Sequence, residues 1–242
     1  MTDLLGALLV ALVALAASTV AAVAGFGGGV ILLPLLVWAF GVRTAVPVLT
    51  IVQLIANVSR IHFNRKELDL RVVGWFALGA VPMAALGALL FASAPATLLR
   101  RVLGAFLLFA VAFRRSRFGR HATMGLRGFA LVGGAFGFLS ALVGVVGPLL
   151  APFYLAHGLK KGGYIGTSSL CSLVMQAVKL LVYGGYGLLD PSSATLGLAI
   201  GVVMILGSYL GDRILDRLPD RVFFLLVEAV LIVSGIQFLL FR

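Results

Sequence analysis

The sequence contains a single cysteine and few carboxylates. With only Cys171 in 242 residues, an internal disulfide and a paired-cysteine metal site are both excluded, and we expect this cysteine to be buried as packing. The chain has eight acidic residues, and no two of them are expected to meet near the middle of a membrane. Nucleotide-binding, zinc-protease and nucleophile-elbow motifs are also absent. The sequence therefore predicts a protein that is not an enzyme and that uses no cofactor or metal.

Apolar residues dominate what is present. They make up 62% of the chain, whereas charged residues make up only 11%, a balance that predicts an all-α polytopic membrane protein. The net charge of +11 does not indicate nucleic acid, because the 17 Phe lie inside apolar runs while Lys and Arg fall between the runs. Positive charges placed in this way set membrane topology. We therefore expect membrane lipid, and no nucleic acid, around this protein.

The first 24 residues have some features of a secretory signal peptide, since small residues follow an apolar run. Their amino-terminal part carries Asp3 and neither Lys nor Arg, and apolar sequence resumes directly after the next glycines. Signal peptides begin with a basic region. We therefore interpret this stretch as a retained helix.

Glycine, proline and charge clusters divide the chain into ten apolar segments. Two of them, 28–40 and 148–157, are too short to cross about 30 Å of hydrocarbon at about 1.5 Å per residue. Each short segment follows a long one and begins at a glycine cluster. The other eight segments are 4–24, 44–60, 72–92, 97–113, 127–146, 163–182, 194–211 and 221–241.

The two short segments mark an internal repeat. "GVILLP" (29–34) aligns with "GPLLAP" (147–152) at an offset of 118 residues, matching glycine to glycine and proline to proline. An offset of 119 then aligns two further pairs, Asn57 with Gln176 and Arg60 with Lys179. Slowly growing offsets are what small loop insertions produce. The sequence thus predicts two homologous halves, each with a helix, a short half-helix broken at Gly and Pro, and three further transmembrane helices.

The repeat divides the chain into a first transmembrane half (1–115), a basic cytoplasmic linker (116–125) and a second transmembrane half (126–242). With the linker in the cytoplasm, 14 of the 19 Lys and Arg face the inside and four face the outside. The remaining one, Lys179, lies near the outer end of its segment, from where it can snorkel to the surface. This bias favours two periplasmic termini and an inverted repeat in the inner membrane.

Irregular backbone at membrane depth is tolerated only where it faces protein or a water-filled cavity. Two broken helices related by an inverted repeat indicate the central site of a transporter, and the amino-terminal ends of their half-helices attract anions. Alternatively, these glycines only permit close helix crossing. The glycines that we expect at the substrate site are Gly27, Gly28, Gly29, Gly144 and Gly147.

The segment after each short element carries the richest set of polar residues within the apolar runs. Gln53 and Asn57 are four residues apart, as are Ser168 and Ser172, so each set lies on one helical face. A neutral donor lining suits a hydrated anion, but it also suits interhelical hydrogen bonds that only hold the bundle. The polar residues predicted to bind substrate are Thr50, Gln53, Asn57, Thr167, Ser168, Ser172 and Gln176.

Few titratable residues lie in or beside the apolar runs. Glu228 is seven residues into the last segment, where a carboxylate can shuttle a proton or pair with Arg221. His62 borders a basic loop, where it is either a surface residue or a pH sensor. We predict Glu228 and His62 as candidates for proton coupling.

Three stretches resemble a known family. "AGFGGGVILLP" (24–34), "VGVVGPLLAP" (143–152) and "GTSSL" (166–170) are similar to the signatures of the TauE/SafE family of sulfite and organosulfonate exporters, over nearly the whole chain. The second stretch has Val145, Val146 and Pro148 where glycine or other small residues are usual. The resemblance implies a carrier for sulfite, sulfoacetate or related anions in the bacterial inner membrane, coupled to the proton gradient.

We therefore predict a secondary transporter of small sulfur-containing anions that works by alternating access. Two alternatives are transport functions, an anion channel and a carboxylate transporter. A third belongs to another class, a membrane assembly subunit that transports nothing. A bundle of this size is compatible with a homodimer.

Overall fold

The computed structural model describes residues 29–115, 124–159, 161–214 and 220–240. These residues form nine α-helices and no strand, so the predicted all-α fold is confirmed. The predicted first segment, 4–24, lies outside the described residues, as do Gly27 and Gly28. The helices are α2 (Gly29–Phe40), α3 (Val42–Phe63), α4 (Leu70–Ser93), α5 (Ala96–Arg115), α6 (Gly128–Val143), α7 (Gly147–Ala156), α8 (Lys161–Gly185), α9 (Pro191–Ile214) and α10 (Asp220–Leu240).

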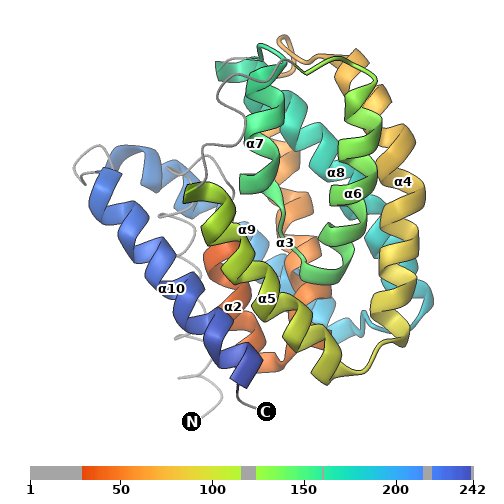
Figure 1. The fold of residues 1–242 in the computed structure, drawn as a ribbon, viewed down its shortest axis with the longest axis vertical. Coiled ribbons are helices and arrows are strands. Elements are labelled where there is room, and N and C mark those ends of the chain that lie inside the picture. Colours follow the sequence, from red (N-terminus) through yellow and green to blue (C-terminus); the bar gives the residue numbers. More distant parts are fainter. Residues whose placement is uncertain (1–28, 116–123, 160, 215–219, 241–242) are drawn as a thin grey trace.

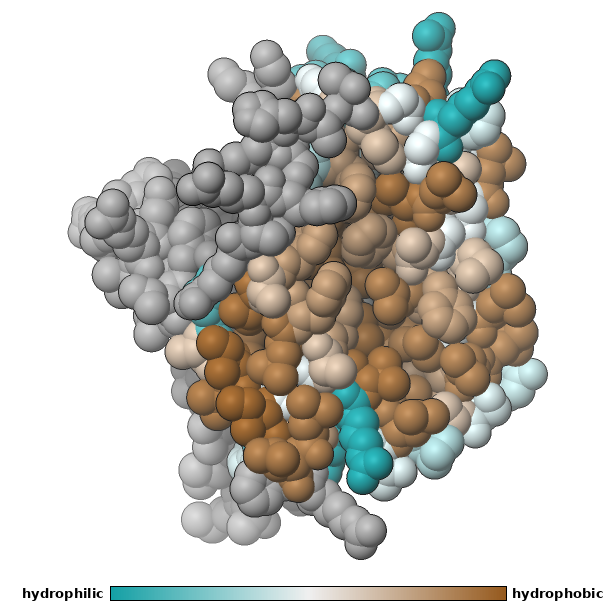
Figure 2. Space-filling view, in the orientation of Figure 1, coloured by the Kyte–Doolittle hydropathy of each residue, from teal (hydrophilic) through white to brown (hydrophobic). Residues whose placement is uncertain are grey.

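Four of these helices contain stretches long and apolar enough to cross a membrane, namely α3, α4, α5 and α8, and shorter apolar stretches lie in α6, α9 and α10. Figure 2 shows a broad apolar surface across the visible face of the bundle, with hydrophilic side chains toward its upper and lower edges. Leu131 and Leu181 expose 80% and 79% of their surface. Lipid tails accept such side chains without cost, so the surface is that of a multi-pass membrane protein.

The order of helix lengths recurs along the chain. The short helix α2 is followed by the three longer helices α3, α4 and α5, and the short helix α7 is followed by α8, α9 and α10. Figure 1 shows α2 in the lower half of the view and α7 in the upper half. The order and the short half-helices agree with the predicted repeat, while its inverted orientation stays a prediction.

Helices α4 and α6 cross at very short range because glycines line their contact. A Cβ added to Gly79 would lie 1.8 Å from the carbonyl oxygen of Ala130, and one added to Gly133 would lie 2.2 Å from that of Phe76. Small residues allow such close approach in membrane bundles. The presence of glycine at these two positions is therefore explained by the close crossing of α4 and α6.

Substituting Gly79→Ala should destabilise the bundle, because the new methyl group overlaps a backbone oxygen that cannot move alone. Overpacking of this kind costs about 1–3 kcal/mol or more. Gly74→Ala on the same helix is the matched control, since nothing lies within 4 Å of a Cβ there. Thermal unfolding in detergent should show a lower melting temperature for Gly79→Ala only, and equal melting temperatures would contradict the close crossing.

Candidate functional site

A polar cavity opens between the two halves of the chain. The first turns of α2 and α7, the end of α6 and one side each of α3 and α8 border it. Its apolar walls include Val52, Val145 and Leu150. The polar residues that line it are Gln53, Asn57, Arg60, Ser140, Tyr154, Tyr164, Ser168, Ser169, Ser172 and Gln176.

The two helix breaks meet at this cavity. Gly29, the first residue of α2, and Gly147, the first residue of α7, both line it. A Cβ on Gly29 would lie 2.9 Å from Cγ2 of Val145, so α2 begins directly against the second break. Gly144 ends α6 with a φ of 82°, a conformation that favours glycine. The amino-terminal ends of both half-helices therefore border one shared space.

An amide bridge ties the two polar faces to the second break. Gln176 Nε2 on α8 donates to Gln53 Oε1 on α3 at 2.6 Å, and Gln53 Nε2 donates to the carbonyl oxygen of Gly144 at 3.2 Å. Gln176 Oε1 is buried and has no hydrogen-bond partner among the described residues. An unsatisfied buried acceptor costs about 1–3 kcal/mol. This oxygen is therefore available to a donor that enters the cavity.

Arg60 is a cavity residue that sequence reasoning did not select. It lies in the last turn of α3, is half-buried, and makes no side-chain hydrogen bond or ion pair with the described residues. Tyr164 on α8 lines the same cavity. Arg60 is one of the 14 Lys and Arg that the charge distribution assigns to the inside. Arg60 follows Asn57 by three residues, so both lie on one helical face. This spacing is the sequence signal that identifies Arg60.

Most of the residues predicted to bind substrate line the cavity. These are Gly29, Gln53, Asn57, Gly147, Ser168, Ser172 and Gln176. Besides Arg60, the polar lining residues that were missed are Ser140, Tyr154, Tyr164 and Ser169. The tyrosines carry no local signal, because they come from the end of α7 and the start of α8, which only the fold brings together.

Three predicted residues lie outside the cavity lining. The hydroxyl of Thr50 donates to the carbonyl oxygen of Val46 at 2.8 Å, and Thr167 Oγ1 accepts the backbone N–H of Asp69 at 2.9 Å. Gly144 lies behind the lining and contributes its carbonyl oxygen to Gln53. These residues therefore support the site without bordering it.

The two candidates for proton coupling are not brought to the cavity. His62 is exposed beside Phe63 at the end of α3, with an edge-to-face ring contact at 5.9 Å. Glu228 lies half-buried on α10, which is not among the helices that border the cavity.

Lys179 does not snorkel to the surface as its position in the sequence suggested. It is fully buried, and its Nζ donates to the carbonyl oxygen of Ser140 at 3.2 Å and to Ser140 Oγ at 3.0 Å. Ser140 lies in the last turn of α6, and the carboxyl-terminal end of a helix carries a partial negative charge. The end of a neighbouring helix, rather than the membrane surface, therefore receives Nζ of Lys179.

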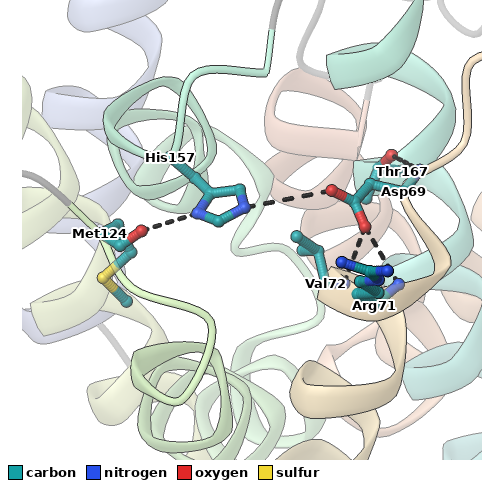
Figure 3. A network of polar contacts seen from close by, with 6 residues as sticks. All are labelled: Asp69, Arg71, Val72, Met124, His157 and Thr167. Carbon is teal, nitrogen blue, oxygen red and sulfur yellow. Dashed lines mark hydrogen bonds and ion pairs between the residues drawn. The ribbon is translucent and has the colours of Figure 1, made fainter.

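A second polar cluster, drawn in Figure 3, joins the α3–α4 loop to the end of α7 and the start of α8. The Asp69 side chain caps α4 by accepting the N–H groups of Arg71 and Val72, and its Oδ2 lies 4.0 Å from His157 Nε2. His157 Nδ1 is 2.6 Å from the carbonyl oxygen of Met124. Glu67 belongs to the same cluster, because its Oε2 accepts a hydrogen bond from the backbone N–H of Gly163 at 3.1 Å. The cluster therefore ties the two halves together at one end of the bundle.

Replacing Asp69 by Ala should lower the melting temperature, because α4 loses its amino-terminal cap, which is worth about 1 kcal/mol. Asp69→Asn is the matched variant, since its amide oxygen can still accept both N–H groups. Thermal unfolding of the two purified variants checks this. If Asn destabilises as much as Ala, the carboxylate acts through His157 rather than as a cap.

Comparison with known proteins gives one match. A family model described as sulfite exporter TauE/SafE matches residues 10–238. No curated protein and no solved structure matches the chain. In the described part of the chain, no group of three His, Cys, Asp or Glu residues is placed to hold a metal ion.

Proposed function

This chain belongs to the sulfite exporter TauE/SafE family, and we propose that it is a secondary transporter that moves small sulfur-containing anions, such as sulfite or sulfoacetate, across the bacterial inner membrane. The family match covers residues 10–238 of 242. The substrate class, the mechanism and the membrane are our proposals. They are supported by the charge and donor pattern of the cavity between the two halves.

The observation that carries this proposal is the guanidinium of Arg60 in a cavity whose other polar walls are neutral. A guanidinium presents several N–H donors in a planar fork that fits the oxygens of a sulfonate or sulfite group. Hydroxyls from Ser169 and Ser172 supply further donors, whereas the Ser168 hydroxyl donates to the carbonyl oxygen of Ile165 at 3.2 Å. A cation in the same place would meet the Arg60 charge, so the cavity favours an anion.

The half-helices add to this preference. Both α2 and α7 begin at the cavity, and the amino-terminal end of a helix carries unpaired N–H groups and a partial positive charge. Pro148 at the start of α7 has no N–H, so the remaining amides of its first turn are the donors there. An oxyanion between Arg60 and these helix ends is stabilised from both sides.

Alternating access fits the position of the cavity. The first half contributes α2 and α3, whereas the second half contributes α6, α7 and α8. A rocking motion of one half against the other would open the cavity to each side in turn, as in other carriers built from repeats. In this proposal the Asp69 and His157 cluster is one of the contacts that such a motion breaks and reforms.

A ligand screen and a flux measurement test the function together. Thermal unfolding is recorded with sulfite, sulfoacetate, isethionate, taurine, thiosulfate and matched carboxylates, because a ligand present at about 100 times its Kd stabilises the folded state by about 2.7 kcal/mol. Flux of the best ligand into proteoliposomes should saturate and respond to an imposed pH gradient. Stabilisation and flux with cations only, or with none of these anions, would overturn the proposal, and flux that does not saturate would favour a channel.

Arg60→Gln should weaken binding of the best sulfonate by about 10- to 150-fold, because a hydrogen bond to a charged group is worth about 1.5–3 kcal/mol. Arg60→Lys keeps the charge but loses the planar fork, so an intermediate loss is expected. Arg65→Gln, at an exposed position in the following loop, is the matched control and should bind as the unaltered protein does. Equal affinity for Arg60→Gln and the control would remove Arg60 from the binding site.

A further inference from the structure

The buried lysine on α8 has no counter-charge on its own helix or on the helices packed against it. Helix α8 packs against α3, α4, α6 and α7, and none of these five helices contains an acidic residue. A lone ammonium ion held in an apolar interior costs several kcal/mol. Among the described residues, a charge on Lys179 is therefore compensated only in part, by the oxygens of Ser140.

The other titratable groups on these helices do not provide the missing negative charge. Helix α3 carries Arg43, Arg60 and His62, α4 carries Arg71 at its first turn, and α6 carries none. The remaining groups are Tyr154 on α7 and Lys161, Tyr164, Cys171 and Tyr183 on α8 itself. Tyr183, one turn beyond Lys179, donates its hydroxyl to the carbonyl oxygen of Ala141 at 2.5 Å. All of these groups are neutral or positive at neutral pH.

Lys179 is connected to the cavity through Ser140. The hydroxyl of Ser140 is 3.0 Å from Lys179 Nζ, and Ser140 is one of the residues that line the cavity. Gln176, which precedes Lys179 by three residues on α8, lines the same cavity and carries the unpartnered Oε1. An anion in the cavity would therefore lie close enough to interact with a charge on Lys179.

The sequence correspondence between the halves gives Lys179 a counterpart. Asn57 is followed three residues later by Arg60, and Gln176 is followed three residues later by Lys179. Each half thus places a cation one turn after a cavity-lining amide. The two cations differ in chemistry, because a guanidinium stays protonated in proteins whereas a buried amine can lose its proton.

We propose that Lys179 holds the proton that is transported together with the anion, an inference that rests on the proposed anion transport. When the cavity is empty, Nζ is a neutral amine bonded to Ser140. When an anion binds beside Arg60, a proton from the solution on the side to which the cavity is open is transferred to the Nζ lone pair, and the ammonium balances the anion. When the anion leaves on the other side, the proton returns to water, so anion and proton cross the membrane together.

Proton uptake on binding tests this directly. The probe is the best-binding sulfonate of the screen that has no second ionisable group, such as isethionate, because its sulfonate keeps one fixed charge between about pH 6 and about pH 9 and does not itself titrate. For the unaltered protein, uptake should approach about one proton per anion, and Kd should rise by up to about tenfold for each pH unit. Both quantities are measured in detergent, by an indicator dye in weak buffer and by thermal-shift titration.

Variants of Lys179 separate proton coupling from helix capping. Lys179→Gln should bind the sulfonate with no proton uptake and with a Kd that changes by less than about twofold over the same range. Lys179→Arg keeps a permanent charge at the end of α6 and should also lose the pH dependence of Kd. This variant replaces Lys179→Gln in the test if the Gln variant does not fold. Lys66→Gln, at an exposed lysine, is the matched control and should keep the full pH dependence. A purely structural lysine would leave the slope of Kd against pH unchanged in every variant that folds.

The outcomes distinguish the two proposals. If no anion binds the unaltered protein, the proposed function fails. If a sulfonate binds without proton uptake, or if uptake persists in both Lys179 variants, anion binding stands and the role of Lys179 is overturned. Uptake that disappears in the Lys179 variants and persists in Lys66→Gln supports it.

Discussion

The amide of Gln53 is the interaction on which the central site depends. It fits only because Gly29 has no side chain, since a Cβ there would lie 2.7 Å from Gln53 Nε2. The same amide donates to the carbonyl oxygen of Gly144 and accepts from Gln176. One side chain on α3 therefore contacts the first break, the second break and α8. Backbone groups freed by helix breaks at membrane depth need such partners, and this contact keeps a polar cavity open between two otherwise apolar halves.

The charges around that contact are of one sign. Arg60 lines the cavity and Lys179 lies just behind Ser140, whereas the helices that surround them carry no carboxylate. Neither residue has an ion-pair partner among the described residues, so a positive charge at either position has no counter-charge there in a region where charge is expensive. In the function proposed above, an anion lowers that cost when it enters, with Arg60 charged throughout and Lys179 charged only when the anion is bound. A protein that needed only stability would gain by replacing both cations with apolar residues.

Sequence patterns predicted the helices and much of the site, and the reasons differ between residues. The break at Gly147 was predictable because it begins an apolar run too short to span a membrane, whereas the residues before Gly29 lie outside the described part of the chain. Gln53, Asn57, Ser168, Ser172 and Gln176 were predictable from spacing on helical faces. Thr50 was not, because its hydroxyl can turn back to its own helix, as it does with Val46. Periodicity shows which face a residue occupies, but it does not show which partner its polar atoms find.

The two cations show why charge alone misleads in a membrane sequence. Arg60 and Lys179 looked like residues that face the membrane surface, because most Lys and Arg in such chains do. Both turn inward, since each lies one turn beyond an amide that borders the cavity and therefore on the same helical face. For these two residues, the helical face on which the cation lies predicts the direction of its side chain better than its distance from the end of the apolar segment does. Since that spacing occurs in both halves, the repeat itself would have indicated that both cations lie on the same helical face as a cavity-lining amide.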